Sequence, residues 1–395
     1  MALKGRKAGR AKAAPEKKSG QKSAKRTPVA STSSALAEYR RVISSSGLAL
    51  VLDASGDHIL QTAQGFISTQ SIALDRLIGC PGVPRGRVTE ISGDPHTGKT
   101  TVTDHIMAEC QKRGGHAVAI DAEQAKDLAY SRKIGLNTDP EYLTWIQPEA
   151  GVPLEKIWGI IDTTVDLMIP ISRSRPIVLV FDSVAMPPTM QELEGDFDPG
   201  KPAVAASANR AAMRRITAKL ARTDIALVVV NHLYTKIGHT FGDPRVEYGG
   251  NAFPMHASLR LRFSTSSLLK SEARGVYGAK VRVEVKKSKV SPTTAHSDYF
   301  AVLHGRGINN AWSVHEHLKS AKYIGGGQGG WHELRAEGFE PLRWRAGEDA
   351  FLHFETAVNE YPELWGNLVS LYMQSGVGAL GMSSWTLPGV AAEVA

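Results

Sequence analysis

The chain has 395 residues with 42% hydrophobic and 22% charged content, which is typical of a soluble globular protein long enough for two domains. No apolar run approaches the length of a membrane-spanning helix, and the start lacks the apolar segment of a secretory signal, so we expect a cytoplasmic protein without a membrane partner. The two cysteines, Cys80 and Cys110, exclude a disulfide framework.

The net charge of +8 comes from the first part of the chain. Residues 1–33 hold ten Lys and Arg against one acid, Glu16, so this stretch carries +9 and the remainder about −1. Because the stretch has few large apolar side chains to bury, we predict a disordered basic tail. Such an arm adds salt-dependent affinity for phosphates. A solubilising tail and an organelle transit segment are the alternatives.

Apolar residues with helical spacing follow the tail: Leu36, Tyr39, Val42 and Ile43. They predict a short N-terminal helix. A short helix after a disordered tail often docks on a neighbouring molecule, so we interpret residues 34–64 as an oligomerisation segment.

Residues 65–307 alternate short β-rich runs with amphipathic segments, which indicates an α/β fold with a largely parallel, twisted sheet. Strands are expected at Arg87–Ser92, Ala117–Asp121, Leu143–Gln147, Ile177–Asp182 and Ile225–Asn231. Helices are expected after Thr100, from Lys126, from Leu154 and at Ala203–Arg222.

Period-two alternation begins beyond Gly250. The runs Leu259–Phe263 and Val281–Val285 predict antiparallel strands that extend the sheet. Residues 308–395 are expected to form a small C-terminal α/β domain. Its glycine-rich loop precedes a segment whose aromatic residues can build a small core: Trp331, Trp344, Phe351, Phe354 and Trp365.

A P-loop follows the first predicted strand of this block, in the run Gly93-Asp94-Pro95-His96-Thr97-Gly98-Lys99-Thr100. The glycines let backbone N–H groups close around phosphate oxygens. Lys99 adds a positive charge for the outer phosphates, and the Thr100 hydroxyl can ligate Mg²⁺. The pattern therefore predicts an ATP site with a metal ligand.

Two acids stand at the ends of predicted strands, where ligands of open α/β sheets bind. Asp182 ends a buried run, and with a P-loop upstream we expect it to hold the Mg²⁺ shell through water. Glu123 can orient the attacking water or take its proton. A simple strand cap for Asp182 and a neighbour of a helix cap for Glu123 are the alternatives.

The order of motifs resembles the bacterial RecA recombinase family, including its phage-encoded members, over about residues 65 to 310. The motifs that carry the resemblance are Ile67-Ser68-Thr69 with Leu74-Asp75, the P-loop, Asp121-Ala122-Glu123, Tyr130 to Gly135, Phe181 to Ala185, Glu192 to Gly195 and Gly249 to Ala252. The resemblance implies a RecA-like P-loop ATPase core, a helical filament on single-stranded DNA, and ATP-dependent pairing with homologous double-stranded DNA. It also implies a nucleoid-associated protein of a bacterial cell or a phage-infected host.

The resemblance further assigns roles to residues around the nucleotide. Glu123 becomes the catalytic carboxylate, Thr101 joins the nucleotide site, and Asp127 and Tyr130 embrace the adenine, Tyr130 by stacking. A surface tyrosine packed on its own helix is the alternative for Tyr130. Lys287 and Lys289 are implied to reach the phosphates of ATP held by the neighbouring subunit, where a solvated charge run is the ordinary interpretation.

Two loops are implied to grip DNA, matching Glu192 to Val204 and Leu233 to Ala252. Long ordered loops in a compact domain are usually functional. The residues matched to DNA contacts are Arg214, Lys236, Phe241, Gly249, Gly250 and Asn251.

The sequence also departs from the family pattern. Ser207 stands where an arginine is usual, and the C-terminus lacks the acidic tail of many bacterial members. His232 ends a predicted strand where a glutamine is expected. In the family that amide senses the terminal phosphate of ATP, so we expect His232 to serve as the sensor. A histidine satisfied by nearby backbone is the alternative.

Two other functions compete with strand exchange. A RecA-like accessory ATPase would bind ATP and DNA as a mediator without exchanging strands, and a hexameric helicase could use the same core. Retention of both loops, Glu123 and the Lys287/Lys289 pair favours the recombinase.

Overall fold

The computed structural model describes Arg41 and residues 65–195, 202–235, 244–291, 296–327, 330–336 and 339–374. The chain divides into a unit of residues 1–59, in which Arg41 alone is described, and a unit of residues 60–395. The predicted tail, and the N-terminal helix apart from Arg41, therefore lie outside the described residues.

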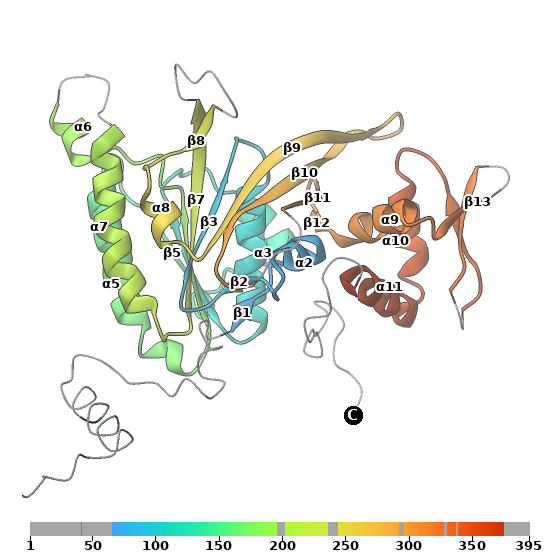
Figure 1. The fold of residues 1–395 in the computed structure, drawn as a ribbon, viewed down its shortest axis with the longest axis horizontal. Helices are drawn as coiled ribbons and strands as arrows, with labels where there is room; N and C mark the ends of the chain where they lie inside the picture. The colour runs from blue at the N-terminus through green and yellow to red at the C-terminus, as the bar shows by residue number, and fades with distance from the viewer. Residues whose placement is uncertain are drawn as a thin grey trace, which may run out of the picture. The chain divides into compact units, whose positions relative to one another are not determined.

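The second unit is built on a ten-stranded sheet (Figure 1). Its order is β12-β11-β10-β9-β3-β7-β6-β4-β5, with β8 paired to β7. Neighbours from β9 through β5 are parallel, whereas β10, β11, β12 and β8 pair in antiparallel fashion. The strands are β3 (Val88–Gly93), β4 (His116–Asp121), β5 (Leu143–Ile146), β6 (Ile177–Asp182), β7 (Ile225–Thr235), β8 (Arg245–Glu247), β9 (Leu259–Ser271), β10 (Gly275–Ser288), β11 (Ser297–Leu303) and β12 (Gly307–Asn309).

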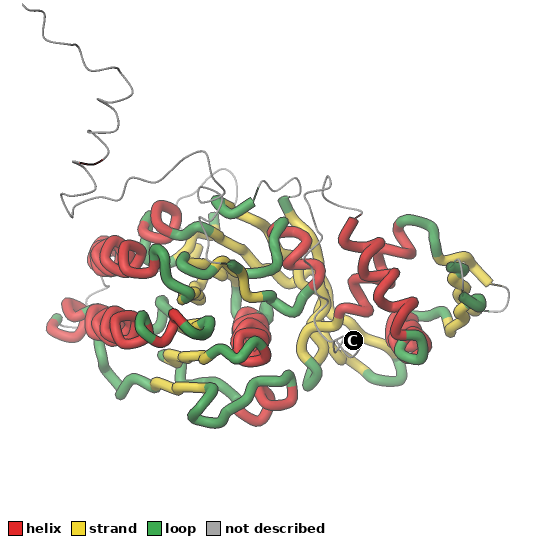
Figure 2. Tube along the Cα trace, turned by 90° about the horizontal axis from the view of Figure 1, so that it is seen from below, coloured by secondary structure: helices red, strands yellow, loops and turns green. Residues whose placement is uncertain are grey.

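Helices cover both faces of this sheet (Figure 2). Along β4, Ala117 and Ala119 join the core under α2 (Ile72–Ile78) and α3 (Lys99–Lys112), whereas Val118 and Ile120 join the core under α5 (Leu154–Met168) and α7 (Pro202–Leu220). Burial on both faces explains why the central strands read as continuous apolar runs. Shorter elements connect them: β1 (Phe66–Ile67), β2 (Val83–Pro84), α4 (Leu128–Lys133), a 3₁₀ turn (Ile171–Arg173), α6 (Met190–Glu194) and α8 (Ala252–His256).

The C-terminal elements include a separate three-stranded sheet, in the order β13-β14-β15. The rings of Trp344 and Phe354 pack with centroids 5.1 Å apart, and both residues are buried in the same cluster as the α2–α3 side of the core. The elements are α9 (Asn310–Ser320), β13 (Ile324–Gly327), β14 (Trp331–Leu334), β15 (Leu342–Arg345), α10 (Ala350–Val358) and α11 (Pro362–Gln374). The large sheet ends at β12, close to the predicted boundary at 308, but that division into domains stays a prediction.

The structure confirms the predicted α/β class, with parallel strands extended by antiparallel ones. The helix expected from Lys126 begins at Leu128, because the Asp127 carboxylate accepts hydrogen bonds from the first backbone N–H groups. The strand expected to end at Asn231 continues to Thr235, where it pairs with β8. Within the described part of the chain, no helix has the length and apolar character needed to span a membrane.

Candidate active site

The P-loop joins β3 to α3 and presents an open helix N-terminus. Gly98 has φ 80°, in the left-handed region that favours glycine, and no side chain among the described residues caps the helix. A Cβ at Gly93 would lie 2.6 Å from the Phe263 carbonyl oxygen, so only glycine fits. Nζ of Lys99 donates to the Gly93 and Asp94 carbonyl oxygens at 3.0 and 2.8 Å. The loop is shaped to wrap an anion.

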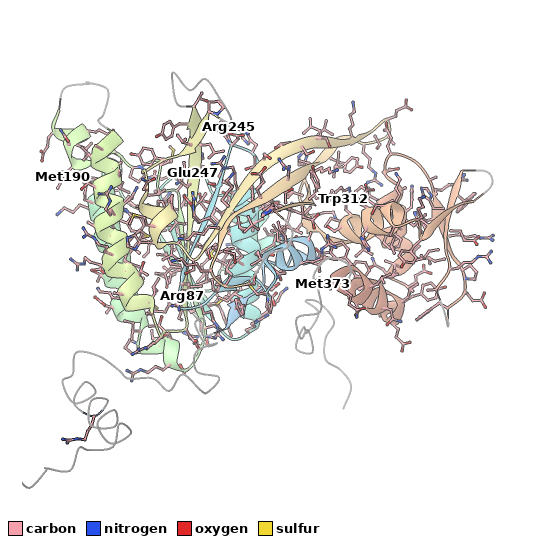
Figure 3. All side chains as sticks on the ribbon, viewed as in Figure 1. Arg87, Met190, Arg245, Glu247, Trp312 and Met373 are labelled. Atoms are coloured by element: carbon pink, nitrogen blue, oxygen red, sulfur yellow. The ribbon has the colours of Figure 1, made fainter. Side chains whose placement is uncertain are left out.

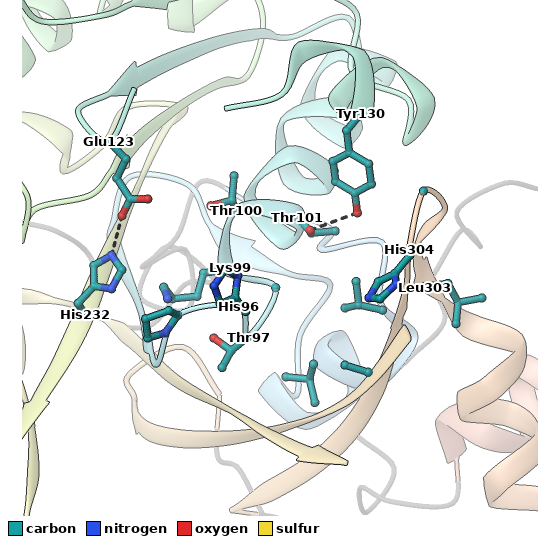
Figure 4. A pocket seen from close by; sticks show the side chains of 16 residues that line it. His96, Thr97, Lys99, Thr100, Thr101, Glu123, Tyr130, His232, Leu303 and His304 are labelled. Atoms are coloured by element: carbon teal, nitrogen blue, oxygen red, sulfur yellow. Dashed lines mark hydrogen bonds and ion pairs between the residues drawn. The ribbon is translucent and has the colours of Figure 1, made fainter. Parts of the chain in front are cut away.

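A cavity of about 520 Å³ opens above this loop (Figure 4). It brings together residues that are distant in sequence, from the P-loop, the segment after β4, α4, β7, β10 and the turn between β11 and β12. The predicted site residues in its lining are Pro95, His96, Thr97, Gly98, Lys99, Thr100, Thr101, Glu123, Tyr130 and His232.

Glu123 and His232 form a pair at one side of this cavity. His232 is the β7 residue opposite Gly93 in the parallel register, and Glu123 follows β4. Nε2 of His232 lies 2.6 Å from Oε1 of Glu123. This hydrogen bond holds the pKa of the Glu123 carboxyl below its usual range despite partial burial. The carboxylate is therefore ionised near pH 7. Sequence reasoning did not predict that these two residues meet.

Asp182 and Thr100 lie together, as expected for a metal site. The Thr100 hydroxyl donates to Oδ2 of Asp182 at 2.8 Å. Oδ1 of Asp182 is buried and has no hydrogen-bond partner among the described residues. Burial raises the pKa of the Asp182 carboxyl to about 6. An unsatisfied carboxylate oxygen beside a hydroxyl is a donor set that suits Mg²⁺.

The two residues expected at the adenine have different positions. Tyr130 lines the cavity, and its hydroxyl lies 3.3 Å from Oγ1 of Thr101. The carboxylate of Asp127 caps α4 by accepting from Ala129 and Tyr130 N–H groups, and it is outside the cavity lining. Asp127 thus fixes the start of the helix that presents Tyr130, while its contact with adenine stays a prediction.

Lys287 and Lys289 lie away from the cavity of their own subunit. Nζ of Lys287 donates to the carbonyl oxygens of Pro254 and Met255, at the end of α8. Partial burial and the charge of Lys289 lower the Lys287 pKa. Burial lowers the His256 pKa, and the charges of Arg214, Lys287 and Lys289 lower it further. The exposed Arg214 of α7 therefore lies in the same region as the two lysines.

The described part of the second predicted DNA loop returns to the core at Gly249 and Gly250, which have φ 84° and 67°. A Cβ at Gly249 would lie 2.1 Å from the Asn209 amide nitrogen, and Asn209 is buried on α7. Asn251 follows as the exposed first residue before α8. Lys236 and Phe241 lie outside the described residues, as do residues 196–201 of the first loop.

Sequence reasoning missed one wall of the cavity. Val302, Leu303, His304 and Gly305 come from the β11–β12 turn, and Ala279 and Val281 from β10. The turn is separated from the P-loop by about two hundred residues in the sequence. Its only signal was a glycine-containing turn, which does not indicate what the turn packs against.

Comparison with known proteins identifies the chain. The family model described as the RecA N-terminal domain matches residues 42–309. The chain belongs to the RecA family. Protein RecA of Syntrophus aciditrophicus strain SB is 37% identical over 272 residues, which cover 69% of this chain and 75% of that protein. Protein RecA of Thioalkalivibrio sulfidiphilus is 35% identical over 303 residues, covering 76% and 82%. Protein RecA of Blastochloris viridis is 40% identical over 246 residues, covering 62% and 67%.

The RecA match ends at residue 309, which is also the last residue of β12. The P-loop, Glu123, Asp182, His232 and both lysines are inside it. The elements from α9 onward are outside it, in agreement with the sequence resemblance, which extends to about residue 310.

Proposed function

We propose that this chain is an ATP-hydrolysing recombinase that assembles as a helical filament on single-stranded DNA and pairs it with homologous duplex. The observation that carries the proposal is the position of His232. It lines the nucleotide cavity, hydrogen-bonds the Glu123 carboxylate, and is followed directly by the second predicted DNA loop. A residue that lines the nucleotide cavity and directly precedes a DNA loop suits a DNA-dependent ATPase.

The residues of the cavity have separate tasks toward ATP. Backbone N–H groups at the start of α3 and the Lys99 ammonium bind the phosphates, for which Lys99 has to leave the Gly93 and Asp94 carbonyl oxygens. Thr100 and Asp182 would hold Mg²⁺, which neutralises phosphate charge when bound. Tyr130 offers an aromatic face on the adenine side.

Hydrolysis depends on a positioned water. The Glu123 carboxylate orients this water and accepts its proton, and His232 holds the carboxylate in place and in its ionised form. The terminal phosphate faces this pair. Lys287 and Lys289 are not in the lining of the nucleotide cavity of their own subunit. They contact instead the phosphates of a nucleotide bound by the adjoining subunit.

DNA contacts come from the two loops and from α7. The Gly249 and Gly250 backbone, Asn251, Lys236 and Arg214 supply phosphate contacts, and Phe241 supplies an apolar contact near the bases. Contacts dominated by phosphates suit a protein that accepts any sequence and leaves recognition to base pairing.

ATP turnover with and without single-stranded DNA tests the proposal. We expect Mg²⁺-dependent release of phosphate that DNA stimulates, and a stalled Lys99→Ala variant. An Arg335→Gln variant, changed at an exposed arginine of the C-terminal region, is the control and should behave as wild type. Turnover that DNA does not alter would contradict the proposal.

A further inference from the structure

The second predicted DNA loop is carried on a two-stranded ribbon, formed by Leu233–Thr235 of β7 and Arg245–Glu247 of β8. Leu233 lies opposite Glu247, and Thr235 opposite Arg245. Because side chains alternate along a strand, Arg245 and Glu247 share one face of β8. Figure 3 labels both residues at this end of the sheet. Residues 236–243 connect the two strands in the sequence.

Arg245 ties the ribbon to the P-loop. Its Nη1 atom lies 2.9 Å from Oδ2 of Asp94. Asp94 is the only acid in the run Gly93–Thr100, and its carbonyl oxygen also accepts a hydrogen bond from the Lys99 ammonium. The same residue therefore contacts Lys99, which is predicted to bind phosphate, and a strand within the second predicted DNA loop.

Glu247 fixes the ribbon independently of Arg245. Its Oε1 atom lies 2.6 Å from Nη2 of Arg262 and 3.3 Å from Nη2 of Arg260, both on β9. Arg260 also pairs with the fully buried Glu90 of β3. These largely buried ion pairs hold β8 in place, so loss of the Arg245 side chain should leave the fold intact.

Resting on the function proposed above, we propose that Arg245 is a positioning residue that couples ATP binding to the second DNA loop through Asp94. The Asp94 carboxylate belongs to the loop that wraps the phosphates, and the negative charge of ATP repels it. Arg245 offsets that repulsion when β8 holds its guanidinium beside Asp94. ATP then favours the arrangement in which β8, within the second predicted DNA loop, is held against the P-loop by the Arg245–Asp94 ion pair.

This coupling is separate from the one through His232. His232 is on β7, just before the ribbon, and contacts Glu123. Arg245 is on β8 and contacts Asp94. Reciprocity requires that ATP tightens DNA binding and DNA tightens ATP binding by the same factor. The side chains of Arg245 and Asp94 are 40% and 41% exposed, so the contribution of this pair should weaken as salt rises.

A double-mutant cycle on the full chain tests the inference. The coupling factor is the ratio of the dissociation constants of a labelled oligo-dT without and with a non-hydrolysable ATP analogue. We expect Arg245→Gln and Asp94→Asn each to lower this factor about two- to fivefold, the range of an exposed ion pair. The double variant should lose no more than either single one. Arg245→Lys, which keeps the charge, should restore most of the factor.

Arg282→Gln is the matched control, because Arg282 is 42% exposed and pairs with Glu284 on β10, away from the ribbon. It should keep the wild-type factor at every salt concentration. A wild-type factor in Arg245→Gln would overturn the inference, and so would losses that add in the double variant. If the wild type binds no oligo-dT in either state, the proposed function fails and this inference fails with it.

Discussion

Nε2 of His232 lies 2.6 Å from Oε1 of Glu123, so the residue that directly precedes the second predicted DNA loop is hydrogen-bonded to the carboxylate proposed to activate water. The contact arises because β4 and β7 are parallel strands of one sheet, and their carboxyl ends meet at the same edge. Any change in the Glu123 environment caused by ATP reaches His232 directly.

Lys99→Ala and Glu123→Gln should fail at different steps. The first removes the phosphate-binding charge and should abolish ATP binding and hydrolysis. The second removes only the proton acceptor, so it should keep ATP binding, slow hydrolysis by about 10²- to 10⁴-fold and lock the protein on DNA. Nucleotide binding, phosphate release and DNA dissociation measure the three effects. Turnover in Glu123→Gln close to wild type would show that another group activates the water.

The His232 imidazole should make ATP-dependent DNA affinity depend on pH. A protonated imidazole donates from both nitrogens and adds a positive charge near the phosphates, whereas a neutral one donates once. Because the His232 contact lowers the Glu123 pKa, the carboxylate stays ionised near neutral pH. ATP should therefore tighten DNA binding most at the lower pH.

Labelled single-stranded DNA, titrated with a non-hydrolysable ATP analogue at several pH values, measures this dependence. Wild type should show a steeper dependence of ATP-linked DNA affinity on pH than His232→Gln. Parallel profiles would show that His232 is not the sensor.

Gly249→Ala should destabilise the fold more than Gly114→Ala. Both glycines have positive φ, 84° and 74°, so both substitutions carry the left-handed backbone cost of about 1–2 kcal/mol. A Cβ at Gly114 meets nothing within 4 Å, whereas at Gly249 it displaces the buried Asn209, whose Oδ1 accepts from Trp158 at 2.7 Å. Denaturant unfolding should show an additional loss of about 1–3 kcal/mol for Gly249→Ala. Equal losses would mean that Asn209 moves aside freely.

Deletion of residues 1–33 should weaken DNA binding at low salt and flatten its salt dependence. Each phosphate contact contributes a slope of about −0.7 on single strands in a plot of log affinity against log salt. The difference in slope between the full and the truncated chain, divided by about 0.7, gives the number of DNA phosphates that the tail neutralises. An unchanged slope would show that the tail does not touch DNA.

Much of the fold followed from local patterns. The continuous apolar run Ile177–Phe181 predicted β6, and the P-loop predicted the end of β3 and the start of α3, each within a residue or two. Both signals are local, because each depends only on the order of a few consecutive residues. The Asp182–Thr100 contact was predictable from the same topology, since both residues stand at the carboxyl edge of the sheet.

The rest depends on chain segments that meet only after folding. The turn at His304 and Gly305 closes the cavity through the order of β11 and β12 in the sheet, which no short pattern encodes. The Arg245–Asp94 pair needs β7 to continue past Asn231 and β8 to fold back on it. Polar residues such as Thr235 gave no sign that the strand continues.

Joint-molecule formation tests the central claim most directly. The wild-type protein, single-stranded DNA and ATP are mixed with either a homologous or a heterologous duplex, and the paired products are separated on a gel. We expect ATP-dependent joint molecules with the homologous duplex alone, and none with Lys99→Ala. ATP hydrolysis and DNA binding without homologous joint molecules would contradict the claim, and would identify the chain as a RecA-like mediator.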